Sequence, residues 1–311
     1  MPAFGPGLPR RVPPRPFGRA YWAMTAFFRD MAQNPLLAPG LVAGLLASIA
    51  CGMIGPYVVT RRIVFLAGAI AHIAVGGVGA ALFLRTVFPQ GWGWLGPKAP
   101  LYGATLAALA AAVVMAFVHQ RAGQHLDTLI GALWSVGMAG GILLGKFTPG
   151  YQSELFGYLF GNIAMVDWSD VRLLALLDGV IVLVVLAFHK RFLAICLDEE
   201  QAALQGVGVL GTHMVLLCLV ALVVIALTQI VGLILVIALL SLPAAAAACF
   251  VVRMGPLLGA SVGLCAVLVT VPRLAVYGTR IGPESAVVLA AAAVYLLALV
   301  IARIRTGHKA A

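Results

Sequence analysis

Long apolar stretches follow one another along almost the whole chain, and this pattern limits the fold more than any other feature. From Leu36 onward nine apolar segments are separated by short polar connections: 38–60, 63–85, 101–119, 126–146, 170–189, 213–229, 232–252, 257–277 and 285–303. A helix needs roughly 20 mostly apolar residues to cross the hydrocarbon core of a bilayer. The sequence therefore predicts an all-α, polytopic membrane helix bundle of about nine spans, with a range of eight to ten.

Composition and charge exclude the common soluble classes. Hydrophobic residues make up 63% of the chain and charged residues only 10%, whereas soluble domains average roughly 45–50% and 25%. The net charge of +10 is explained by basic residues at the cytoplasmic ends of helices, so we expect contact with membrane lipids and no nucleic acid. The five dispersed cysteines give neither a disulfide framework nor zinc-finger spacing.

The two ends of the apolar pattern set the domain boundaries. Residues 1–35 interleave prolines with arginines, a composition that cannot bury a core, and the apolar stretch Ala20–Phe28 is too short to span. We predict a disordered basic tail with an interfacial segment over 1–35, and a transmembrane domain over 36–311. Within that domain Met214–Val252 is too long for one helix, and Thr228-Gln229 with Gly232 offers the only polar break.

Basic residues predict the orientation of the chain in the membrane. They occupy alternate connections, which the positive-inside rule places in the cytoplasm: Arg61, Arg62, Arg121, Lys190, Arg191, Arg253, Arg303, Arg305 and Lys309. The connection Phe147–Asp170 is then outside. Nine spans put the arginine-rich tail outside as well, against the rule, so either the tail is an exception or the true number of spans is eight or ten.

No segment of the chain has the features of an ATPase or of a common hydrolase. Gly140–Phe147 nearly spells a phosphate-binding loop, but Phe147 replaces the magnesium-binding hydroxyl and the glycines lie in a predicted span. If transport uses ATP, a separate subunit must hydrolyse it. An intramembrane enzyme would depend on the few polar residues inside spans, chiefly His72 and Asp178.

His72 is the most informative polar residue inside a predicted span. Gly68, His72, Gly76 and Ala80 follow one another at four-residue spacing, so they share one face of a helix that faces protein. An ionisable side chain at membrane depth is a functional-site hypothesis by default, and imidazole suits zinc, manganese or iron. The alternative is a histidine that hydrogen-bonds a neighbouring helix.

The most strongly charged interior segment is acidic. Leu197–Gly208 predicts a short amphipathic helix that ends in glycine. Its polar residues are those of a solvated loop or of a docking element for a soluble partner, and the residue pattern alone leaves both readings open.

Four stretches in this order resemble the metal-importing ABC permeases of the zinc and manganese uptake family, over about residues 38–305. They are Arg61–His72, Asp127–Gly131, Tyr158–Asn162, and Asp198–Val207 followed by Leu239–Ala245. The resemblance implies a type II ABC importer-like permease in the bacterial cytoplasmic (inner) membrane. It also implies a homodimer of this chain, two copies of a cytoplasmic ABC ATPase subunit, and an extracytoplasmic metal-binding protein that delivers the ion.

The same resemblance assigns roles to residues. It makes Asp198–Gly208 the coupling helix that sits on the ATPase, with Asp198, Glu199, Glu200, Gln201 and Gly206 as the coupling residues. The family commonly carries Asp-x-x-x-His in its second span, but here Gly68 stands in place of the aspartate. We expect His72, completed by Glu154 of the outer connection or by a second His72 across the dimer axis, to meet the metal in transit.

We therefore expect a transport subunit, not an enzyme, that carries a divalent metal ion as its substrate and holds no covalently bound cofactor. Zinc is the first expectation, and manganese and iron are the alternatives. Two further alternatives are a permease for metal chelates such as siderophores or cobalamin and an intramembrane enzyme.

Overall fold

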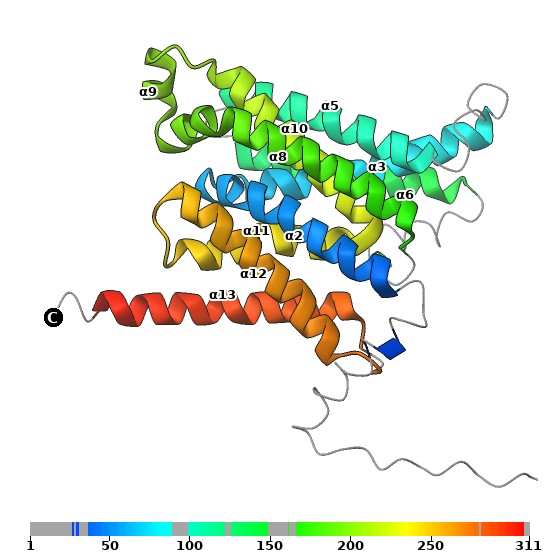
Figure 1. The fold of residues 1–311 in the computed structure, drawn as a ribbon. Helices are drawn as coiled ribbons and strands as arrows, with labels where there is room; N and C mark the ends of the chain where they lie inside the picture. Colours follow the sequence, from blue (N-terminus) through cyan, green and yellow to red (C-terminus); the bar gives the residue numbers. More distant parts are fainter. Residues whose placement is uncertain are drawn as a thin grey trace, which may run out of the picture.

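A computed structural model describes residues 27, 29–30, 37–88, 99–121, 126–148, 161, 166–279 and 281–307. The described chain is a bundle of long apolar helices with one short helix, α9, at one end (Figure 1). The helices are α2 (Leu37–Thr60), α3 (Val64–Val87), α5 (Ala99–Arg121), α6 (Leu126–Lys146), α8 (Trp168–Leu197), α9 (Glu199–Leu204), α10 (Val209–Val231), α11 (Leu233–Ala248), α12 (Met254–Ala275) and α13 (Pro283–Gly307).

Each of the nine predicted spans corresponds to one of these helices, and the short helix α9 is the one that matches no predicted span. Seven described helices are long and apolar enough to cross a membrane, and Ile130–Lys146 of α6 and Leu233–Ala248 of α11 are shorter apolar helices. The prediction of an all-α polytopic bundle is confirmed within the described residues. The predicted break at Gly232 is also confirmed, because this residue lies between α10 and α11 with a φ of 85°, a conformation that glycine adopts without steric cost.

Two predicted boundaries were wrong. The span predicted at 170–189 continues as α8 to Leu197, because no helix breaker follows Lys190 and because Phe192 and Ile195 are buried. Lys190 and Arg191 therefore lie in a helix and not in a loop. The span predicted at 232–252 is shorter, since α11 ends at Ala248. Its 16 residues reach only about 24 Å at 1.5 Å per residue.

Small residues allow close packing around α3. A Cβ atom added to Gly76 would lie 2.7 Å from the carbonyl oxygen of Gly137 in α6, and one added to Gly77 would lie 2.3 Å from that of Gly103 in α5. Side chains at these positions would push the helices apart. Small residues thus let helices pack closely on both sides of α3.

Most of the described basic residues lie at one end of the bundle, and Arg85, Lys146, Arg172 and Arg273 lie toward the other. The helix α9, the α11–α12 connection that contains Arg253, and the C-terminal end of α13 lie at the same end (Figure 1). Arg61 joins them there, because it hydrogen-bonds the end of α8. The chain enters α2 at the opposite end (Figure 1).

The described part of the N-terminal tail contacts the turn after α12. Phe27 is fully buried and packs edge-on against Tyr277, with ring centroids 5.0 Å apart. The Tyr277 hydroxyl donates a hydrogen bond to Asp30 at 2.9 Å. These contacts attach Phe27 and Asp30 to the bundle, and the predicted domain boundary at residue 36 stays a prediction. Residues 1–26 lie outside the described part of the chain.

Candidate functional site

The acidic segment forms a capped helix, as the sequence predicts. The Asp198 side chain accepts hydrogen bonds from the backbone N–H groups of Glu200 at 2.9 Å and Gln201 at 3.1 Å. It thereby satisfies donors that the first turn of α9 leaves free. The chain leaves the helix through Gly206, whose φ is 81°. Both ends of α9 are therefore fixed by local chemistry.

The outer surface of α9 is open to solvent and carries both acidic and apolar side chains. Leu204 is 89% exposed and Leu197, at the end of α8, is 79% exposed. Between the two helices lies a hollow of about 250 Å³. It is lined by Lys190, Leu193, Ala194, Leu197, Asp198, Gln201, Ala202 and Gln205. Exposed leucines beside a hollow are features of a docking surface.

Arg61 anchors α9 to the membrane helices. Its guanidinium donates a hydrogen bond to the Ile195 carbonyl at 2.7 Å and forms an ion pair with Glu199. The Arg61 side chain is only 10% exposed, whereas that of Glu199 is 39% exposed. The end of α2, the end of α8 and the start of α9 are thus connected through one arginine.

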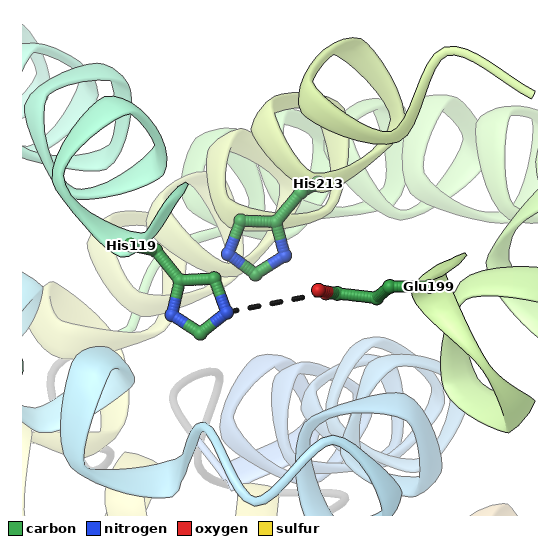
Figure 2. Close-up of side chains that lie close together, drawn as sticks. All are labelled: His119, Glu199 and His213. Atoms are coloured by element: carbon green, nitrogen blue, oxygen red, sulfur yellow. Dashed lines mark ion pairs between the residues drawn. The ribbon is translucent and has the colours of Figure 1, made fainter. Parts of the chain in front are cut away.

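Two histidines complete this junction. His119 near the end of α5 and His213 near the start of α10 point toward Glu199 of α9 (Figure 2). The imidazole rings stack with centroids 4.5 Å apart and an interplanar angle of 20°, and His119 Nε2 lies 4.0 Å from a Glu199 carboxylate oxygen. Among the described residues this is the one group of three or more His, Cys, Asp or Glu side chains that are close enough to hold a metal ion.

His72 lies at a different place, between α3 and α6. Its ring stacks on Trp134 with centroids 4.5 Å apart, and its Nδ1 atom is buried with no hydrogen-bond partner among the described residues. The same tryptophan lies over Gly68, where an added Cβ would be 2.8 Å from the indole. Trp134 therefore takes the space that a side chain at position 68 would need. The expectation that the His72 face packs against protein is confirmed.

The structure describes some of the other residues that the sequence analysis singled out, but not all of them. Glu154 lies outside the described residues, so its predicted meeting with His72 stays a prediction. Asp178 is buried in α8, and neither carboxylate oxygen has a partner among the described residues. The near match to a phosphate-binding loop is part of α6. Its backbone N–H groups are used within the helix, so Gly140 and Gly145 form no phosphate cradle.

Sequence reasoning did not assign a role to Arg61, His119 or His213 in a site. One signal was available, because all three are polar residues at the ends of apolar segments that the basic-residue pattern places on one side of the membrane. Nothing in their spacing along the chain indicates that α5 and α10 bring the two histidines into contact.

The fold and the anchored helix α9 together define a class: a multi-pass membrane protein with a rigid polar helix at its basic end. The profile of the ABC 3 transport family matches residues 33–302. The chain belongs to the ABC 3 transport family.

Relatives and a solved structure agree with this membership. A protein of Chlamydia trachomatis named "Probable metal transport system membrane protein" is 40% identical over 220 residues, covering 71% of this chain and 73% of the relative. The "Manganese transport system membrane protein MntC" of Listeria monocytogenes is 30% identical over 221 residues, covering 71% and 74%. The structure of PsaBC from Streptococcus pneumoniae in complex with Fab is similar, with a TM-score of 0.75, 26% identity, and coverage of 88% and 94%.

Proposed function

We propose that this chain is the membrane-spanning permease subunit of an ATP-driven importer of divalent metal ions in the bacterial cytoplasmic membrane. The observation that carries the proposal is α9. It is a capped helix with exposed leucines beside a hollow, at the basic end of the bundle, in a chain of the ABC 3 transport family. Asp198, Glu199, Glu200, Gln201 and Gly206 belong to this element or cap it, and they are the proposed coupling residues.

The proposed partners are an ATPase and a metal-binding protein, and two features of the described residues support the ATPase. The described residues contain no phosphate cradle, so ATP hydrolysis falls to a separate subunit, with two copies serving a homodimer of this chain. A rigid helix transmits a movement of the ATPase to the spans better than a loop does. The hydrogen bond of Arg61 to Ile195 and its ion pair with Glu199 connect α9 to α2 and α8. An extracytoplasmic metal-binding protein delivers the ion at the opposite face.

We propose zinc as the transported ion and His72 as a residue of its path. Imidazole is a good zinc ligand, and the unpartnered Nδ1 of His72 is a free coordinating atom at membrane depth. Manganese is the second candidate, because the Listeria relative is named for manganese transport. A neutral nitrogen suits zinc better than manganese, which prefers carboxylate and carbonyl oxygens.

ATP-driven uptake of radioactive zinc and manganese tests the proposal in vesicles that contain the permease and its ATPase. We expect uptake of zinc that needs ATP, and strongly reduced uptake in His72→Gln at equal assembly and equal ATP hydrolysis. His189→Gln is the matched control. His189 in α8 forms a hydrogen bond with the Tyr57 hydroxyl at 2.6 Å, whereas His72 lies between α3 and α6. Absence of ATP-driven uptake of any divalent metal would contradict the proposed function. Normal uptake in His72→Gln would contradict only the role of His72.

A further inference from the structure

The junction of α5, α9 and α10 brings together three metal-ligating side chains that the proposed transport path does not use. We propose that His119, Glu199 and His213 form a second divalent-cation site, one that holds a zinc-like ion at the coupling helix. Each residue comes from a different helix (Figure 2). A bound ion would therefore join α9 directly to two membrane helices.

The donor set and its spacing fit this class of ion. Two imidazoles and one carboxylate are the ligands of many zinc sites that keep a fourth position open for water. The donor atoms of His119, Glu199 and His213 all lie within 4.8 Å of one another. Two donors on one tetrahedral zinc are about 3.3 Å apart at normal bond lengths. Closing the site thus takes side-chain movements on the order of 1.5 Å, and because the two imidazoles are stacked, both rings have to rotate together with the partly exposed Glu199.

Each imidazole of the cluster has one buried nitrogen without a hydrogen-bond partner among the described residues. His213 is only 1% exposed, and its Nε2 atom has no hydrogen-bond partner among the described residues. The same is true of His119 Nδ1. Buried polar atoms are normally paired, and the stack of the two imidazoles gains nothing from leaving them unpaired. As the rings stand, the nitrogens near Glu199 and its partner Arg61 are His119 Nε2 and His213 Nδ1, so the unpartnered nitrogens reach an ion there only when the rings rotate.

In this structure the Arg61 guanidinium pairs with the carboxylate that the proposed metal ion would bind. This guanidinium also lies 3.4 Å from His213 Nδ1, so the site already holds one positive charge. A second cation has to draw Glu199 away from Arg61, which keeps its hydrogen bond to Ile195. Metal binding would thus exchange a link between α2 and α9 for a link among α5, α9 and α10. The site is a device by which a metal ion changes how α9 is held.

A binding experiment on the tag-free, full-length permease in lipid nanodiscs tests the site without the ATPase. After treatment with a chelator, Zn²⁺ binding is measured by calorimetry, and Co²⁺ is used as a coloured substitute whose absorption reports imidazole ligation. We expect His119→Gln and His213→Gln to lose one bound ion per chain and its Co²⁺ absorption. His189→Gln should keep this ion, because His189 does not belong to the cluster.

Arg61→Gln provides a test that misfolding cannot imitate. This variant removes the competitor for Glu199 and the repelling charge, so we expect Zn²⁺ to bind roughly tenfold more tightly. Unchanged Zn²⁺ stoichiometry in both histidine variants, or weaker Zn²⁺ binding in Arg61→Gln, would overturn the proposal. The result is separable from the proposed function, because a chain that binds no ion here can still import metal, and a chain that binds one can still fail to transport.

Discussion

The side chain of Asp198 offers a direct test of whether the stability of α9 matters for coupling. Its carboxylate accepts both hydrogen bonds at the start of α9, from Glu200 at 2.9 Å and Gln201 at 3.1 Å. The helix has only six residues, too few to form without external support. Replacing Asp198 by Ala removes the cap, whereas Asp198→Asn keeps an oxygen that accepts the same bonds and removes the charge.

The expected size of the effect follows from the loss of the cap. Replacing an N-cap aspartate by alanine costs about 1 kcal/mol, which raises the population of locally opened helix roughly fivefold. Asp198→Asn should change this population by less than a factor of about two, because asparagine and aspartate are equivalent caps. The ion pair between Arg61 and Glu199 is present in both variants, so it cancels in the comparison.

Hydrogen–deuterium exchange on the reconstituted complex measures this opening directly. The amides of Glu200–Gln205 should exchange about fivefold faster in Asp198→Ala than in Asp198→Asn. ATP-coupled uptake should fall only in the alanine variant. Equal exchange rates in the two variants would refute the capping argument. Loss of uptake in both variants, with exchange changed in only one, would show that the charge of Asp198 acts on the ATPase.

Three further outcomes are expected. Gly206→Val should impair uptake and Gly206→Asn should not, because no atom lies within 4 Å of an added Cβ and the φ of 81° alone disfavours a branched side chain; equal uptake would contradict this. In a cysteine-free background, a cysteine at position 154 should react with an impermeant thiol reagent only from outside, and reaction only from the cytoplasm would invert the topology. Partial burial, and then the hydrogen bond to Asp30, raise the pKa of Tyr277 above its ordinary value of 10.0. The neutral phenol therefore supports the contact below pH 10, and this support is lost as the pH rises through the raised pKa; comparison of the tyrosinate absorbance of the parent and of Asp30→Asn should show one tyrosine that titrates at lower pH in the variant, and no shift would contradict the assignment.

The helices were predictable because their signal is local. Apolar length and glycine breaks decide where a chain can cross a bilayer, and Gly232 separates α10 from α11 as expected. The helix ends were less predictable. The positive charge of Lys190 suggested the end of a span, yet α8 continues for another two turns because Phe192 and Ile195 find buried positions. Tertiary packing, which one sequence does not display, determined that boundary.

The two candidate functional sites also differ in how far the sequence predicts them. The helix α9, the proposed coupling helix, was visible in the sequence, because its cap and terminal glycine lie within a few residues of one another. The cluster of His119, Glu199 and His213 was not visible, since it depends on contacts between α5, α9 and α10. A close approach of residues almost a hundred positions apart has no local signature.

The two proposed metal sites differ in a way that suits transport. At His72 there is a single imidazole, and Trp134 fills the space over Gly68, so this chain supplies one neutral ligand there. Such a site releases its ion readily, as conduction requires. At the end of α9 three donors lie within 4.8 Å, where retention of an ion does not block the path. Weak ligation along the spans and stronger ligation beside the coupling helix would let imported metal affect the helix that drives its import.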